Sequence, residues 1–238
     1  MDTTQSLFIQ RPMTSQRPLL GVTTLVIEDS RFASEAIRLL CLRSGARIRR
    51  ADSLAHAERH LQVYRPGVLI VDLGLPDGSG LDLIERLAKA SPRVDVILGT
   101  SGDDGAEAAA LAAGADGFMA KPVVSLAAFQ DMILRHLPRH TRPRGLRLVQ
   151  DERVEPDIIA YHDDLTHVAT VLDGDTAPET IDYVTQFLGG VARSAADRDM
   201  GLAVDRLAAR RAAGGPLGGT LTSLTALVEQ RLATAQFR

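Results

Sequence analysis

Between residues 22 and 137 the chain alternates short apolar runs with helix-like stretches, and it does so five times. Strands that alternate with helices of about 10–15 residues form a parallel sheet whose two faces are both covered. The nearly continuous apolar character of the runs VLIV and VIL agrees with strands that are buried on both faces. We therefore predict an α/β domain over residues 22–137. Its expected strands are 23–28, 46–51, 67–72, 93–100 and 115–120, and its expected helices are 30–45, 53–64, 79–90, 103–114 and 124–137.

The remainder of the chain has a different character. Residues 157–238 contain only helix-like stretches, which predicts an all-α helical bundle with helices at 157–172, 178–195, 199–213 and 221–235. The stretch 138–156 is rich in Pro and Arg and is predicted to be a linker. Residues 1–21 form an N-terminal extension whose apolar members are expected to pack on the first domain. These apolar members are Leu7, Phe8, Ile9 and Leu19.

Composition narrows the class of protein. A hydrophobic share of 45% supports a real core, and a formal net charge of −3 gives no sign of a polyanion-binding protein. The single cysteine, Cys41, excludes an internal disulfide framework and is expected to be a small buried hydrophobe. We see no signal peptide and no apolar run approaching the roughly 18 residues that span a bilayer. The sequence therefore predicts a cytoplasmic protein with no membrane partner.

Several polar side chains stand where the expected strands end. Glu28 and Asp29 close the first strand, Asp72 the third, Thr100 and Ser101 the fourth, and Lys121 the fifth. Parallel strands bring these positions to one rim of the sheet, where ligands of open α/β sheets bind. Carboxylates crowded there repel each other by about 4 kcal/mol per pair at roughly 4 Å and an effective dielectric constant of about 20.

A hard divalent cation removes that repulsion, and Mg²⁺ typically takes one or two carboxylates together with waters and phosphate oxygens. Asp72 is then placed to be charged and nucleophilic, and a carboxylate that attacks phosphorus gives an acyl phosphate. Lys121, one of only two lysines among 27 basic residues, would pair with the oxygens of the transferred group as a compact charge.

The same residues carry a resemblance to a known family. Residues 22–137 resemble the receiver domain of bacterial response regulators in element order and in the motifs VIEDS, VDLGLPDGSG, GTSG and AKP. The resemblance implies a flavodoxin-like fold with parallel sheet order 2-1-3-4-5. It also implies Mg²⁺-dependent transfer of a phosphoryl group from a phosphohistidine, carried by a sensor histidine kinase or a histidine phosphotransfer protein, to an aspartate.

Carried over residue by residue, the resemblance makes Asp72 the phosphoacceptor and Lys121 its phosphate-pairing lysine. The metal ligands that it implies are Glu28, Asp29, Asp72 and the backbone carbonyl of Gly74. It also implies a switch: Thr100 binds the phosphoryl oxygen, Phe118 changes rotamer with it, and the bond before Pro122 is commonly cis.

Alternatives exist for the same residues. An aspartate before a Gly/Pro turn is usually a turn residue, and Glu28–Asp29 alone could be a charge pair at a helix N-terminus. Haloacid-dehalogenase-type phosphatases also place a nucleophilic Asp after an apolar run. They need a second Asp two residues later, where this chain has Gly74, and their metal-binding acids follow the lysine. The combination of motifs on four strands favours the receiver interpretation.

A fainter resemblance covers roughly residues 158–234, which look like the core helices of histidine phosphotransfer domains. Leu188, Gly190 and Ala192 match that pattern, whereas Gln186 occupies the histidine position and Gly189 the position of the usual lysine. An amide accepts no phosphoryl group usefully at neutral pH. We therefore expect a degenerate phosphotransfer-like or dimerisation domain that serves as a docking surface, with a possible homodimer.

The second half has two alternative functions. A DNA-binding transcriptional regulator is disfavoured because residues 142–238 hold eleven Arg, no Lys and fourteen acids, a net charge of −3. An active phosphorelay protein would use His162 or His167, which lie five positions apart. His56 and His60 are expected on a solvated helix face. The glycines Gly214, Gly215, Gly218 and Gly219 are predicted to form a loop and no P-loop, because no Lys-Ser/Thr follows.

The sequence thus predicts a two-domain response regulator that accepts a phosphoryl group on Asp72 and signals through protein–protein contacts. We expect no enzyme activity beyond Mg²⁺-dependent self-phosphorylation, a downstream protein partner, and no nucleic acid.

Overall fold

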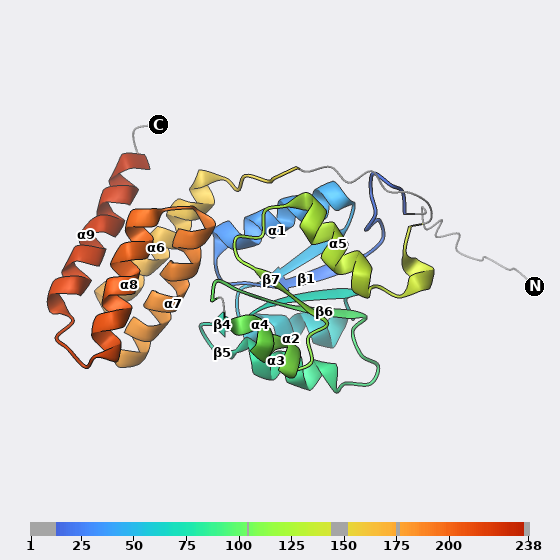
Figure 1. The fold of residues 1–238 in the computed structure, drawn as a ribbon, viewed down its shortest axis with the longest axis horizontal. Coiled ribbons are helices and arrows are strands. Elements are labelled where there is room, and N and C mark those ends of the chain that lie inside the picture. The colour runs from blue at the N-terminus through green and yellow to red at the C-terminus, as the bar shows by residue number, and fades with distance from the viewer. Residues whose placement is uncertain (1–12, 104, 144–151, 175–176, 236–238) are drawn as a thin grey trace, which may run out of the picture.

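A computed structural model describes residues 13–103, 105–143, 152–174 and 177–235 of the chain. A five-stranded parallel sheet lies at the centre of the N-terminal part, with strand order β2-β1-β3-β6-β7 (Figure 1). This order confirms the predicted flavodoxin-like topology, in which the chain reverses direction across the sheet next to β1. The five strands are β1 (Thr23–Ile27), β2 (Arg47–Ala51), β3 (Val68–Asp72), β6 (Val96–Ser101) and β7 (Gly117–Ala120).

Helices cover both faces of this sheet. α1 (Arg31–Ser44) and α5 (Leu126–His136) pack on one face, and α2 (Leu54–Val63), α3 (Gly80–Ala88) and α4 (Ala106–Ala112) lie on the other (Figure 1). Every residue of β3 is buried, which explains its unbroken run of apolar side chains before Asp72. Two hydrophobic clusters, one on each side of the sheet, fill the space between the helices and the strands.

Local chemistry fixes the ends of α1, the helix that follows the first strand. The hydroxyl of Ser30 accepts a hydrogen bond from the Ala33 N–H, as expected of an N-cap serine. At the other end Gly45 adopts φ 82°, a left-handed conformation that glycine enters at little cost. Between them Cys41 is completely buried, and burial raises the pKa of its thiol to about 12. The prediction of a buried, inert cysteine is confirmed.

Two short strands and one helix start differ from the sequence prediction. β4 (Gly74–Leu75) and β5 (Gly78–Ser79) form a small antiparallel hairpin directly after β3, which apolar periodicity alone does not signal. Helix α9 begins at Gly218, so the prediction that Gly218 and Gly219 belong to a loop is wrong. Glycine disfavours a helix by about 1 kcal/mol, but the buried Leu224 of the same helix contributes more than that to the core below it.

Four helices make up the C-terminal part, here called the helical unit: α6 (Ile158–Gly174), α7 (Pro178–Ser194), α8 (Arg198–Ala212) and α9 (Gly218–Ala235). α6 packs on α7 and α9, and α8 packs on the same two helices, so the four surround one apolar core (Figure 1). No helix in the described residues combines the length and apolarity needed to cross a membrane.

Asp197 ties three of these helices together. Its carboxylate accepts hydrogen bonds from the Met200 N–H at the start of α8, from the Tyr161 hydroxyl of α6 at 2.9 Å, and from the Arg231 guanidinium of α9 at 2.7 Å. These bonds, led by that of Arg231, lower the pKa of Asp197 to about 2. The helical unit therefore contains a charged cluster that depends on an ionised aspartate.

The segments predicted as extension and linker lie partly outside the described residues. Leu7, Phe8 and Ile9 fall in that undescribed part, whereas Leu19 is completely buried in the core of the N-terminal part. At the far end of the predicted linker, the Leu126 N–H donates to the Glu152 carbonyl, and Val154 is buried in the same core. Both flanks of the α/β domain therefore add to its hydrophobic core.

The helical unit sits against the first turn of α1. The buried carboxylate of Asp164 in α6 accepts hydrogen bonds from the Ser30 hydroxyl at 2.7 Å and from the N–H groups of Arg31 at 2.7 Å and Phe32 at 3.1 Å. The ring of Phe32 enters the core of the helical unit and meets Tyr161 edge-on at 5.8 Å. Asp164 of the helical unit thus accepts hydrogen bonds from N–H groups in the first turn of α1, which have no partner within that helix.

Candidate functional site

Three carboxylates meet at the end of the sheet that faces the helical unit. Glu28 and Asp29 follow β1 and Asp72 ends β3, and each offers an oxygen within 4.8 Å of the other two. Glu28 and Asp72 are buried, with exposed fractions of 3% and 7%. The neighbouring, parallel register of β1 and β3 brings together residues that lie more than forty positions apart.

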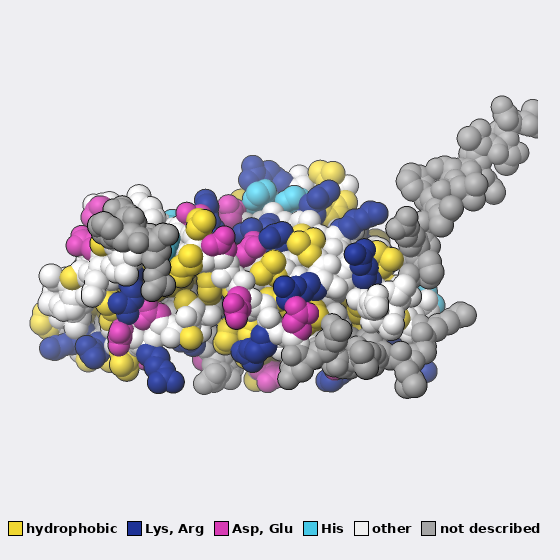
Figure 2. Space-filling model, turned by 90° about the horizontal axis from the view of Figure 1, so that it is seen from above, with side chains coloured by type: hydrophobic (Ala, Val, Ile, Leu, Met, Phe, Trp, Pro, Cys, Tyr) yellow, Lys and Arg dark blue, Asp and Glu magenta, His cyan; other side chains and the backbone are white. Residues whose placement is uncertain are grey.

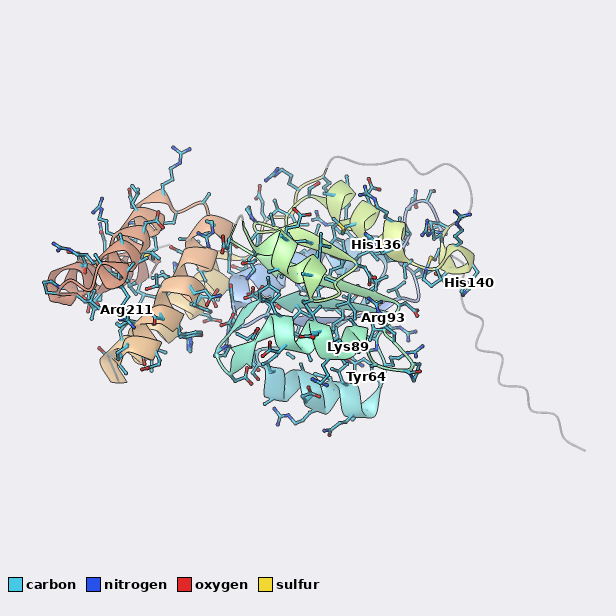
Figure 3. The ribbon with its side chains drawn as sticks, turned by 60° about the horizontal axis from the view of Figure 1, so that its bottom comes forward. Tyr64, Lys89, Arg93, His136, His140 and Arg211 are labelled. Atoms are coloured by element: carbon cyan, nitrogen blue, oxygen red, sulfur yellow. The ribbon has the colours of Figure 1, made fainter. Side chains whose placement is uncertain are left out.

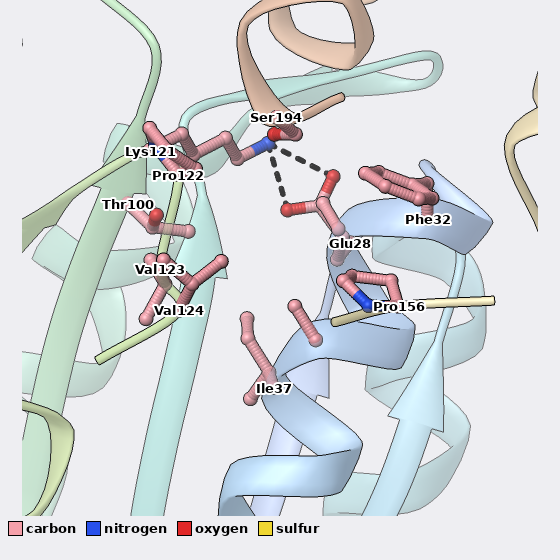
Figure 4. Close-up of a pocket in the computed structure, with 12 residues that line it drawn as sticks. Glu28, Phe32, Ile37, Thr100, Lys121, Pro122, Val123, Val124, Pro156 and Ser194 are labelled. Carbon is pink, nitrogen blue, oxygen red and sulfur yellow. Dashed lines mark hydrogen bonds and ion pairs between the residues drawn. The ribbon is translucent and has the colours of Figure 1, made fainter. Parts of the chain in front are cut away.

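Lys121, directly after β7, supplies the opposite charge (Figure 4). Its ammonium group lies 2.7 Å from a carboxylate oxygen of Glu28. It also lies 3.1 Å from a carboxylate oxygen of Asp72. Burial opposes the charge of Lys121, but the attraction of Glu28 and Asp72 outweighs it and raises the pKa of the ammonium. The only other lysine, Lys89, lies exposed directly after α3 (Figure 3) and pairs with Glu85 of that helix. The two lysines therefore have opposite environments.

One ammonium does not balance three acids. Burial, together with the charge of Asp72, raises the pKa of Asp29 to about 7 and holds that of Glu28 well above its usual range, although Lys121 works against both shifts. Crowded carboxylates with raised pKa values are what a bound cation would stabilise in their ionised form. The oxygen-only donor set suits a hard ion, so the cluster fits Mg²⁺ in the chemistry of its ligands. Gly74 lines the same pocket.

The predicted switch residues lie on β6, on β7 and directly after β7. Thr100 pairs with Asp72 across β6 and β3, is completely buried, and donates its hydroxyl to the Met119 carbonyl at 2.8 Å. Phe118 is buried on β7, and the Lys121–Pro122 peptide bond is cis. In this conformation the hydroxyl of Thr100 is engaged with the neighbouring strand. Ser101, the polar residue that follows Thr100 at the end of β6, lines the acidic pocket.

The acidic pocket has a volume of about 470 Å³, and α7 forms its far wall. Tyr183 of α7 donates its hydroxyl to Asp29 at 3.1 Å, and the ring of His167 lies within hydrogen-bond distance of that hydroxyl. Burial and the nearby charge of Asp29 raise the pKa of Tyr183. Sequence reasoning missed Tyr183 as a partner of Asp29 and Arg193 as a residue of the acidic pocket, because no motif links them to the acids.

The α7 residues that line the pocket are Gln186, Phe187, Gly190, Val191 and Arg193. Gln186, which stands at the histidine position of the phosphotransfer pattern, lies so close to Gly74 that a Cβ there would overlap its amide nitrogen. His162 and His167 lie on α6, outside this pocket, and His56 and His60 stack on each other on α2 at 5.0 Å. The structure thus brings a glutamine, and neither candidate histidine, to the acidic pocket.

The parallel five-stranded sheet with buried acids and a lysine at its carboxyl end is the arrangement that the resemblance to a receiver domain implied. Residues 24–133 match the profile of the response regulator receiver domain. This part of the chain is therefore a response regulator receiver domain, as the sequence motifs indicated. The name receiver is used below for residues 22–137.

The chain is similar to curated relatives and to solved structures. The chain is 30% identical over 133 residues to the KDP operon transcriptional regulatory protein KdpE of Escherichia coli, with 55% of this chain and 59% of that protein covered. It is 31% identical over 115 residues to the probable transcriptional regulatory protein TcrX of Mycobacterium tuberculosis, with 48% and 47% covered. The chain thus spans about half the length of the curated relatives it matches. A solved receiver domain of a histidine kinase from Syntrophus aciditrophicus aligns at 22% identity and a TM-score of 0.46, covering 54% of this chain and 99% of that one.

Proposed function

We propose that the receiver accepts a phosphoryl group on Asp72 from a phosphohistidine of a sensor histidine kinase or a phosphotransfer protein. The observation that carries this proposal is the contact of Asp72 with Lys121 in a pocket that two further acids share. A carboxylate held beside a fixed cation and a cluster of oxygen ligands is prepared to attack phosphorus, because the charge of the incoming group is balanced in advance.

Each neighbour of Asp72 has a part in this reaction. Glu28 and Asp29, with Asp72, would hold Mg²⁺, which when bound neutralises the phosphoryl oxygens. An oxygen of Asp72 attacks phosphorus and the donor histidine leaves. Lys121, already in contact with Asp72, pairs with one phosphoryl oxygen. Thr100 turns its hydroxyl from the neighbouring strand toward another oxygen, and Phe118 follows into the space that this movement opens.

The output of this switch is proposed to be a protein–protein contact. Phosphorylation is expected to rearrange the α4–β7–α5 surface and to change its contact with the helical unit or with a partner, and the main contacts of the helical unit are with α1 and with β4. This arrangement favours a second protein as the reader of the α4–β7–α5 surface. Phosphorylation at Asp72 would also act directly on the helical unit, because α7 forms a wall of the same pocket.

The curated relatives are named as transcriptional regulators, so DNA binding is the alternative output. Two observations favour the protein contact. Arg211 on α8 (Figure 3) is paired with Asp182 of α7, which leaves it less available for a phosphate. On the face seen in Figure 2, basic and acidic side chains are interspersed and form no continuous basic surface.

Labelling with ³²P-acetyl phosphate in the presence of Mg²⁺ tests the phosphoacceptor. We expect label on the wild-type chain, none above background on Asp72→Asn, and wild-type labelling on Asp82→Asn, which removes an exposed acid of α3. Equal labelling of wild type and Asp72→Asn would reject the assignment. Retention of a labelled duplex DNA by the phosphorylated chain, lost progressively with added salt, would replace the protein contact by the transcriptional output.

A further inference from the structure

One face of α7 is directed at the phosphoacceptor pocket. Gln186, Gly190 and Arg193 follow each other at spacings of four and three residues, which places them on one side of a helix, and all three line the pocket. Gly190 has no side chain, so it leaves space between the amide of Gln186 and the guanidinium of Arg193. Within the described residues, the amide of Gln186 forms no hydrogen bond with the acids or the lysine of the pocket.

The receiver is shaped to admit these two side chains. Gly74 lies two positions after Asp72, and Gly102 lies two positions after Thr100. A Cβ on Gly74 would overlap the amide nitrogen of Gln186, and a Cβ on Gly102 would lie 2.5 Å from the guanidinium of Arg193. At the two positions that flank the pocket mouth, the receiver therefore has no side chain, and α7 supplies a glutamine and an arginine instead.

The place that they occupy is the attacking side of a phosphoryl group on Asp72. Displacement at phosphorus proceeds roughly in line, so a nucleophile must approach opposite the Asp72 oxygen. Asp72 ends β3, and α7 crosses that end of the sheet beside β4 (Figure 1), so the opposite side is the side of α7. The pocket of about 470 Å³ has room for a phosphoryl group and several waters, since one water takes about 30 Å³.

We propose that α7 makes this chain a hydrolase of its own aspartyl phosphate, with Gln186 orienting the attacking water and Arg193 stabilising charge on the transferring group. This inference rests on the proposed phosphorylation of Asp72. In phosphoryl-transfer enzymes a glutamine amide orients water and an arginine supplied beside the phosphate stabilises the transition state. Gln186 is exposed at the pocket mouth, where solvent water enters.

The reaction balances with water as its only co-reactant. The water oxygen forms a bond to phosphorus while the bond between phosphorus and the Asp72 oxygen breaks, and its electron pair stays on the carboxylate. The protons of the water leave with inorganic phosphate. Asp72 is thereby restored, and the helical unit acts as a timer of the signal.

The test follows the loss of phosphate from the full chain. Wild type, Gln186→Ala and Arg193→Ala are labelled with ³²P-acetyl phosphate and Mg²⁺, the donor is removed, and protein-bound label and released phosphate are measured over time. Gln230→Ala and Arg206→Ala serve as matched controls, since both residues are exposed on the helical unit away from the pocket. We expect at least about a tenfold slower loss of label for both pocket variants, a threshold set below the roughly 100-fold lower end of positioned-group effects, and unchanged loss for the controls.

Each outcome decides between the two proposals. If wild type takes up label on Asp72 but Gln186→Ala loses it at the wild-type rate or faster, α7 is only a cover and the hydrolase inference is overturned. If wild type neither holds label nor releases more phosphate than Asp72→Asn, the phosphoacceptor assignment itself fails. Phosphate release from wild type with little retained label, together with retained label in Gln186→Ala, supports both.

Discussion

Removal of the Asp164 carboxylate should release the helical unit from the receiver. In Asp164→Ala the N–H groups of Arg31 and Phe32 and the hydroxyl of Ser30 lose their shared acceptor. Hydrogen bonds to a charged group contribute about 1.5–3 kcal/mol each. The cost of burying the Asp164 carboxylate offsets part of this stabilisation. Burial is also the first cause of the raised pKa of Asp164. We expect a net loss of about 3 kcal/mol in the docking free energy, a shift of roughly 100-fold in the docking equilibrium.

Hydrogen exchange measured by mass spectrometry reports this change directly. The peptide that contains Arg31 and Phe32 should lose roughly 100-fold of its protection in Asp164→Ala, as should the facing peptide of α6. Asp163→Ala is the matched control. Its carboxylate pairs with Arg31 in an ion pair whose side chains are 66% and 43% exposed, so its removal should cost no more than about 1 kcal/mol.

Two results would refute this reasoning. Protection at Arg31 and Phe32 within about fivefold of wild type in Asp164→Ala would mean that apolar contacts alone hold the two parts together. An equal loss of protection in Asp163→Ala and Asp164→Ala would mean that the burial of the Asp164 hydrogen bonds makes no difference to docking. Unchanged far-ultraviolet circular dichroism of both variants serves as the check that the helices remain folded.

Two further predictions concern pH and metal. The pKa of Asp197 is lowered to about 2, so its contribution to the stability of the helical unit is complete above about pH 4 and is lost as the pH falls toward 2. In Arg231→Met, Asp197 lacks its main partner. Acid unfolding followed by circular dichroism should therefore show a smaller loss of stability between pH 4 and 2 in this variant than in wild type. A profile equal to that of wild type contradicts this prediction. Added Mg²⁺ should raise the melting temperature of wild type because it binds the folded acids, and should raise that of Asp29→Asn much less. Equal shifts in both proteins would place the ion elsewhere.

The receiver was largely predictable because its signals are local. Apolar runs at strand spacing, the capping residues Ser30 and Gly45, and the acids after the first and third strands are read within a few positions of each other. The sheet order then follows from the family resemblance, and parallel pairing brings Glu28, Asp29 and Asp72 to one rim. Local pattern was less informative where glycines stand in a helix, as at the start of α9.

The sequence by itself also determined that position 186 is glutamine within a phosphotransfer-like pattern, and that Lys121 is one of two lysines. Only the tertiary structure decided that α7 faces the receiver of its own chain. Tyr183 of α7 and Asp29 are joined by a hydrogen bond although they lie 154 positions apart. Asp164 accepts hydrogen bonds at the start of α1, which begins 133 positions earlier in the chain. Such contacts depend on how two separately folded surfaces fit together, and no periodicity along the chain encodes that fit.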